Sequence, residues 1–264
     1  MKNSNYISFF NNYQNIGNKL LILNELLFDD NHEGAHDFIL LCDFIDDYIA
    51  REFQINTFNF FYFIVFEGDR CSGKDIIINE LAKDEKFSKL PRINNNNPAW
   101  KKLNDKKQNC YFKLENILDS VLLWYSDLAF RVSNWEINDS DLIYLVNRYC
   151  DSVNICIISN YCNELSIKEI ERLTRLLNNF EKFFPISEKT IVLDVDHNTQ
   201  VERQFQSRNR IFTKEEADTA VINIELFKMI NKHNTYIIDA TENFENVLEN
   251  IKNILYNIKE RDKG

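Results

Sequence analysis

Glycine and proline are scarce in this sequence. Its 264 residues include only five glycines and three prolines. Because these residues mark turns and interrupt helices, their scarcity predicts a chain that is rich in long helices. The chain is long enough to bury a sizeable core, either as one large α/β domain or as one domain with an extension.

Zinc-ribbon cysteine spacing and long apolar runs are also missing. The six cysteines are scattered and form no C-x-x-C pair, which excludes zinc-ribbon spacing. The longest apolar run, 60–66, is far too short to span a bilayer. The first residues contain no continuous apolar stretch, so we expect no signal peptide. Reduced thiols in a cytoplasmic protein with no membrane partner are the simplest interpretation.

Positive charge is in deficit, since the formal net charge is -10. A protein whose main partner is duplex DNA or RNA usually carries a basic surface that neutralises phosphates. We therefore expect no nucleic-acid partner, although a local basic pocket is compatible with this charge.

Apolar residues recur with two periods along the chain. Before residue 58 their helical spacing predicts two helices. From residue 58 onward, apolar strand-like runs alternate with amphipathic segments. The predicted strands are 58–68, 141–149, 189–195 and 235–240; the predicted helices are 74–83, 111–135, 162–184, two within 198–232, and 243–260; and 90–109 is predicted to be a surface loop. The alternation predicts an α/β domain over 58–264, with a mostly parallel sheet flanked by helices, and a helical N-terminal extension over 1–57.

A glycine-rich segment follows the first predicted strand and opens a helix. Gly68, Gly73 and Lys74 fit the pattern G-x-x-x-x-G-K. Glycines let backbone N–H groups approach an anion, and the helix start adds positive charge. Lys74 would reach the outer phosphates of ATP. The predicted nucleotide-binding residues are Gly68, Asp69, Arg70, Cys71, Ser72, Gly73, Lys74 and Asp75.

One position of this loop departs from the pattern. Ser or Thr normally follows the lysine and ligates Mg²⁺, but this chain has Asp75. A carboxylate also binds Mg²⁺, yet it adds negative charge beside the phosphates. Asp75 is therefore either a direct metal ligand or the mark of a weakened site.

Four short segments occur in a recognisable order. They are Phe66-Glu67-Gly68, then NRYCDS at 147–152, then LDV at 193–195 followed by spaced arginines, and finally IDA at 238–240. In this order, over roughly residues 59–260, the chain resembles the thymidylate kinase family of nucleoside-monophosphate kinases. The resemblance implies a three-layer P-loop fold, ATP and Mg²⁺ as cofactors, a nucleoside monophosphate (above all dTMP) as substrate, and a homodimer.

The resemblance also implies roles for single residues. Arg148, with Tyr149 beside it, would hold the acceptor's monophosphate, and Arg208 and Arg210 would approach the transferring phosphoryl group from a mobile lid. The family's Asp-Arg pair corresponds to Asp69-Arg70, one position early, which adds Arg70 to Lys74 in the catalytic set. Asn147 stands where the family has an acidic residue.

The same resemblance implies that the predicted helix 111–135 contacts the base of the substrate. Trp124 and Arg131 are two helical turns apart and share one face of that helix. Plain core packing is the alternative for Trp124, a surface salt bridge for Arg148, and a solvated charged turn for the lid arginines.

A competing signal lies near the N-terminus. Residues 32–36 read H-E-G-A-H and match the zinc-protease pattern H-E-x-x-H. Gly34 weakens a helix there, so a polar helix start is the simpler interpretation. Three functions follow: a kinase that phosphorylates a nucleoside monophosphate, a nucleotide-binding sensor or subunit with lost catalysis, and a zinc hydrolase.

Overall fold

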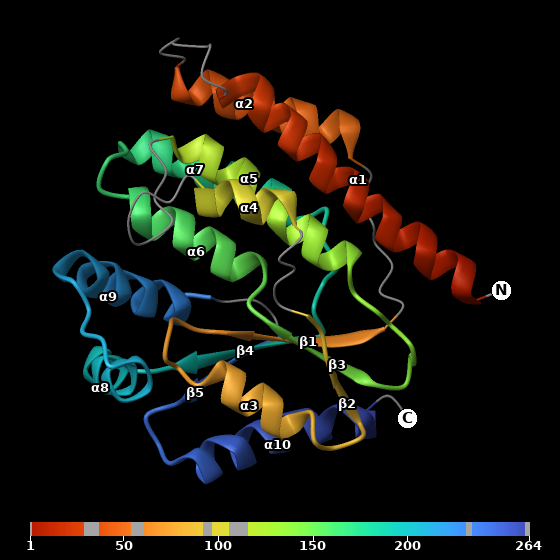
Figure 1. Cartoon of the computed structure of the whole chain (residues 1–264), viewed down its shortest axis with the longest axis vertical. Coiled ribbons are helices and arrows are strands. Elements are labelled where there is room, and N and C mark those ends of the chain that lie inside the picture. Colours follow the sequence, from red (N-terminus) through yellow and green to blue (C-terminus); the bar gives the residue numbers. More distant parts are fainter. Residues whose placement is uncertain are drawn as a thin grey trace. The chain divides into compact units, whose positions relative to one another are not determined.

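The structure is a computed structural model, and it describes residues 2–28, 37–53, 61–91, 97–105, 116–230 and 234–261 (Figure 1). The H-E-x-x-H segment at 32–36 lies outside these residues, as does the beginning of the predicted strand 58–68. The chain forms two compact units. A sheet unit comprises Phe61–Lys89, Asp141–Ile155 and Ser187–Gly264, and a helical unit comprises Met1–Phe60, Leu90–Ser140 and Cys156–Ile186.

The sheet unit contains five parallel strands in the order β2-β3-β1-β4-β5. The strands are β1 (Tyr62–Glu67), β2 (Phe87–Lys89), β3 (Ile143–Asn147), β4 (Lys189–Asp194) and β5 (Thr235–Asp239). Central strand β1 is buried at every residue after Tyr62, as its unbroken apolar run predicts for a strand covered on both faces.

Helices cover both faces of this sheet. They are α3 (Lys74–Leu81), the first part of α6 (Cys150–Tyr161), α8 (His197–Arg208), α9 (Lys214–Lys228) and α10 (Phe244–Arg261). On one face, α3 and α10 pack their buried isoleucines and leucines onto β1, β3 and β4 (Figure 1). On the other, Phe227 of α9 and Ile155 of α6 pack on Val192 of β4. The predicted three-layer α/β architecture is confirmed.

The helical unit is built from α1 (Lys2–Phe28), α2 (Phe38–Glu52), α4 (Pro98–Asp105), α5 (Ile117–Ser133), α7 (Ile167–Glu181) and the end of α6. Asn24 of α1 donates to the Asp119 carboxylate of α5 at 2.6 Å. Arg172 of α7 pairs with Asp43 and Asp46 of α2. The N-terminal helices thus share a unit with the middle of the chain, and the predicted boundary at residue 57 stays a prediction.

Three local assignments need correction. The predicted loop 90–109 contains helix α4, because the side chain of Asn97 accepts from the backbone N–H groups of Ala99 and Trp100 and Pro98 occupies the first helical position. Helix α6, which follows directly after β3, was not predicted, and the short strand β2 was also missed. Ser166 and Glu169 form a capping box at the start of α7.

No helix within the described ranges combines the length and the apolar composition that a bilayer crossing requires.

Candidate phosphate-binding site

The glycine-rich loop lies where the carboxyl end of central strand β1 meets helix α3. Gly68 and Gly73 have φ angles of 127° and 95°, and Cys71 between them has φ 59°. Glycine adopts such angles at little cost. Strand β1 lies at the centre of the sheet, between β3 and β4. The next two strands in the chain, β2 and β3, lie on one side of β1, and the last two, β4 and β5, lie on the other side. Open α/β sheets bind ligands beyond the carboxyl ends of the strands at such a switch point.

Lys74 opens α3 and is buried. Its Nζ donates to the carbonyl oxygens of Gly68 at 2.7 Å and Asp69 at 2.5 Å, and to Ser72 Oγ at 2.8 Å. The ammonium group therefore lies against the loop itself and links its two ends. This geometry brings a positive charge to the backbone turn that the sequence predicts to bind phosphate.

The carboxyl end of β3 lies beside the same loop. Arg148 has φ 66°, and its backbone N–H donates to the carbonyl oxygen of Phe66 at 3.0 Å. Tyr149 is buried, with its ring against Phe63 at 5.7 Å in an edge-on arrangement. The left-handed backbone at Arg148 is an uncommon conformation for a residue other than glycine, and such positions cluster at functional sites.

The two positions that depart from the family pattern contact each other. Asn147 Nδ2 donates to Asp75 Oδ1 at 2.6 Å. Asn147 is buried, and its Oδ1 has no hydrogen-bond partner within the described residues. A carboxylate and an amide oxygen are hard ligands of the kind that Mg²⁺ prefers. No group of three or more His, Cys, Asp or Glu side chains suited to a metal occurs in the described ranges.

Glu67 belongs to the motif Phe66-Glu67-Gly68, but its role at the site was not predicted. It is fully buried at the end of β1, where its carboxylate accepts hydrogen bonds from the backbone N–H of Tyr149 at 2.8 Å and from the Oγ of Ser152. Burial raises the pKa of Glu67 and the neighbouring Asp151 raises it further, while the Ser152 hydrogen bond opposes both. Glu67 thus joins the phosphate loop to the start of α6. The sequence signal that could have identified Glu67 is a carboxylate at the end of an apolar strand.

Glu67 predicts a pH-dependent stability. In the unfolded chain Glu67 ionises near its ordinary pKa of 4.5, whereas burial raises the pKa in the folded chain. Between these two values the folded state binds the extra proton, so the free energy of unfolding falls as the pH rises. Glutamine does not titrate. We expect the stability of Glu67→Gln, relative to the wild type, to increase as the pH rises above about 4.5 in urea unfolding. Parallel pH profiles for the two proteins would contradict this.

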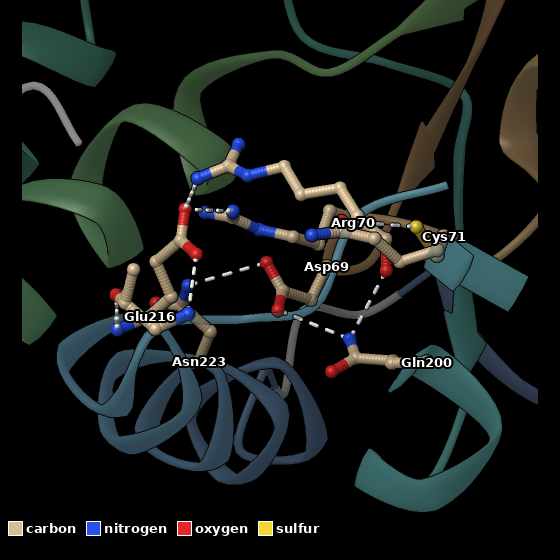
Figure 2. A network of polar contacts seen from close by, with 9 residues as sticks. Asp69, Arg70, Cys71, Gln200, Glu216 and Asn223 are labelled. Atoms are coloured by element: carbon tan, nitrogen blue, oxygen red, sulfur yellow. Dashed lines mark hydrogen bonds and ion pairs between the residues drawn. The ribbon is translucent and has the colours of Figure 1, made fainter. Parts of the chain in front are cut away.

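Asp69 faces helices α8 and α9 (Figure 2). Its Oδ2 accepts from Gln200 Nε2 at 3.0 Å, and its Oδ1 accepts from Asn223 Nδ2 at 3.2 Å. Gln200 Nε2 also lies 3.1 Å from the carbonyl oxygen of Arg70. The side chain of Asp69, predicted as a nucleotide-binding residue, therefore fastens the loop to the two helices. Gln200 and Asn223 were not predicted.

The glycine-rich loop has a second attachment to α8, through Cys71. Arg203 donates to the carbonyl oxygen of Cys71 at 3.3 Å and to that of Ala240 at 2.6 Å. The thiol of Cys71 lies 3.7 Å from Gln204 Oε1. Arg203 was noted only as one of several spaced arginines; here it joins the phosphate loop to the end of β5.

Two of the predicted catalytic arginines meet at one carboxylate. Arg210 Nη2 lies 2.5 Å from Glu216 Oε1, and Arg70 Nη1 lies 3.8 Å from the same oxygen (Figure 2). The Arg70 guanidinium also lies 5.5 Å from the centre of the Phe212 ring. Arg208 ends α8, and its side chain is outside the described part of the chain.

The predicted base-contacting residues belong to the helical unit. The ring of half-buried Trp124 lies 6.5 Å from that of Trp100, and both pack against a cluster formed by α1, α4 and α5. Arg131 Nε lies 3.1 Å from Asp127 Oδ2. Burial raises the pKa of Asp127, and Arg131 opposes that rise. The role of Trp124 and Arg131 at a base stays a prediction.

Comparisons with known proteins agree on the fold. No family model matches the sequence, and no curated protein matches it. Among solved structures, deoxyadenosine kinase from M. mycoides with bound dATP aligns with a TM-score of 0.54 and 18% identity, over 73% of this chain and 98% of that chain. Thymidylate kinase from Candida albicans aligns with a TM-score of 0.53 and 16% identity, over 75% of this chain and 92% of that chain. The chain has the fold of these nucleoside and nucleotide kinases.

Proposed function

We propose that this protein transfers the γ-phosphoryl group of ATP to a (deoxy)nucleoside monophosphate, with dTMP as the first candidate, and forms the diphosphate. The buried Lys74 ammonium on the loop at the end of β1 carries the proposal. Both structural neighbours named above are kinases of nucleosides or nucleotides, which supports the same class of reaction. The homodimer that the resemblance implies stays a prediction.

Catalysis of this kind depends mainly on positioning and on neutralising charge. Backbone N–H groups of residues 68–75 and the start of α3 would hold the phosphates of ATP. Arg148 would hold the acceptor phosphate, since a planar guanidinium can donate two parallel hydrogen bonds to two phosphate oxygens. Arg70 and Arg210 would offset charge on the transferring group. Asp75, with Asn147, would hold Mg²⁺, which would supply positive charge that offsets the charge of the phosphates.

Asp75 and Asn147 are the residues that would hold the metal. Together they offer a carboxylate and a buried amide oxygen that has no hydrogen-bond partner among the described residues. We expect Asp75→Ala to raise the Mg²⁺ concentration needed for half-maximal turnover by roughly tenfold. Asp75→Ser, which restores the usual hydroxyl, should recover most of this loss. Glu80→Gln, a change at a half-buried position on the same helix, is the control. A Mg²⁺ titration in which Asp75→Ala follows the wild type would refute the metal role.

A nucleotide-binding protein without catalysis is the second candidate. The Asn147 amide donates to the Asp75 carboxylate, which places a donor group where a metal ligand needs free lone pairs. A sensor or subunit of this kind would bind ATP and be stabilised by it, but would form no product.

One assay separates these two candidates. The protein is incubated with Mg-ATP and each common (deoxy)nucleoside monophosphate in turn while ADP is followed; deoxynucleosides are included because one structural neighbour is a deoxyadenosine kinase. The kinase proposal predicts ADP that depends on one or a few acceptors. Thermal stabilisation by ATP with no acceptor-dependent ADP would favour the second candidate and sink the first.

A further inference from the structure

The carboxylate of Glu216 occupies an unusual position for a charged group. Its side chain has 0% exposure, and Oε1 lies 2.5 Å from Arg210 and 3.8 Å from Arg70. A single buried carboxylate therefore lies between a guanidinium from the phosphate loop and one from the segment that joins α8 to α9 (Figure 2).

Glu216 is held in place by the start of α9. Its Oε2 accepts from the backbone N–H of Thr213 at 2.7 Å, and its own N–H donates to Thr213 Oγ1 at 3.2 Å, which completes a capping box. The backbone beside Arg70 is held as well, because Asp69 is bound by Gln200 and Asn223. The Glu216 carboxylate and the backbone next to Arg70 are therefore both anchored.

Charge explains why a fixed carboxylate matters here. Two guanidinium groups repel each other, and a carboxylate between them offsets that repulsion. Together the three side chains keep an excess of one positive charge next to the glycine loop. The Arg70 and Arg210 side chains are 23% and 44% exposed, so each guanidinium retains surface through which it can approach a ligand.

We propose that Glu216 is a positioning residue that holds Arg70 and Arg210 together as a paired site for a phosphoryl group of the bound polyphosphate. The inference rests on the proposed function only in that residues 68–75 bind a polyphosphate. The ligand class is a linear phosphoanhydride, which needs the closely spaced bidentate donors that two arginines supply.

The capping box allows the charge of Glu216 to be separated from its structural role. Glutamine also serves at this third helical position, so Glu216→Gln keeps the cap and removes the charge. Thr213→Ala does the opposite, because it weakens the cap and leaves the carboxylate. Glu169→Gln is the matched control: it makes the same change in the capping box of α7, where the partner is Ser166 alone.

Calorimetric binding of inorganic tripolyphosphate is the readout, since it needs no turnover. We expect Glu216→Gln and Arg210→Ala each to weaken binding by about tenfold, and the double variant to bind about as weakly as either single variant, because the two residues act as one unit. Glu169→Gln should bind like the wild type. Thr213→Ala keeps the Glu216 carboxylate, so it should lower the unfolding temperature and weaken binding less than Glu216→Gln does.

Three results would overturn the positioning role. They are wild-type affinity in Glu216→Gln, independent and multiplying losses in the double variant, and a wild type that does not bind tripolyphosphate. If the variants bind tripolyphosphate as expected but the wild type forms no ADP with any acceptor, only the kinase proposal is refuted.

Discussion

Lys74→Ala is expected to lower turnover by at least ~100-fold, the scale seen when one preorganised hydrogen-bond donor to a transition state is removed. The substitution deletes the buried ammonium and its three hydrogen bonds to the loop. The loss of charge weakens attraction for the outer phosphates, and the loss of hydrogen bonds loosens the backbone that would surround them.

Steady-state ADP formation and calorimetric ATP binding measure this effect. Lys83→Ala is the control, because Lys83 follows the same helix and makes only an exposed pair with Glu80. That variant should keep wild-type rates, since exposed pairs contribute little. Unchanged ATP affinity and turnover in Lys74→Ala would refute the assignment of the phosphate loop.

Gly68→Ala is expected to be the most damaging substitution for the fold of the site. The residue has φ +127°, and an added Cβ would lie 2.5 Å from the backbone carbonyl oxygen of Leu193 in β4. Neither a strained φ nor a backbone clash is relieved by a side-chain movement. We expect a loss of at least ~2 kcal/mol in the free energy of unfolding, together with loss of ATP binding.

Gly73→Ala separates the two causes. Gly73 has φ +95°, but in the described part of the chain no heavy atom beyond its immediate neighbours and its own helix backbone lies within 4 Å of the position that its Cβ would take. Its cost should therefore be the backbone strain alone, about 1 kcal/mol. Urea unfolding of the three proteins gives the comparison. Equal stability losses for the two alanine variants would show that β4 does not constrain the loop at Gly68.

Local signals explain what the sequence could predict. The apolar run of β1 and the spacing of Gly68, Gly73 and Lys74 are adjacent in the chain, so the strand, the loop and the helix start follow from neighbouring residues. The short motif NRYCDS at 147–152 located Arg148 at the end of strand β3. The prediction of a surface loop over 90–109 missed Asn97, whose side chain caps helix α4.

The rest of the site depends on residues far apart in sequence. Gln200 and Asn223 bind Asp69 across more than a hundred residues, and a single amide on an amphipathic helix carries no motif. Glu216 had a visible capping-box spacing with Thr213, but its contact with Arg70 follows only from the packing of α8 and α9 around the loop. Pairings of this kind are set by tertiary structure, which a periodicity does not encode.

A crystal structure of the protein with ATP would test most directly the idea on which these proposals depend. We predict that the β-phosphate lies inside the turn formed by residues 68–75, with its oxygens within hydrogen-bond distance of the backbone nitrogens there and of Lys74 Nζ. Electron density for ATP at any other place on the chain, with this turn closed around its own lysine, would contradict the account.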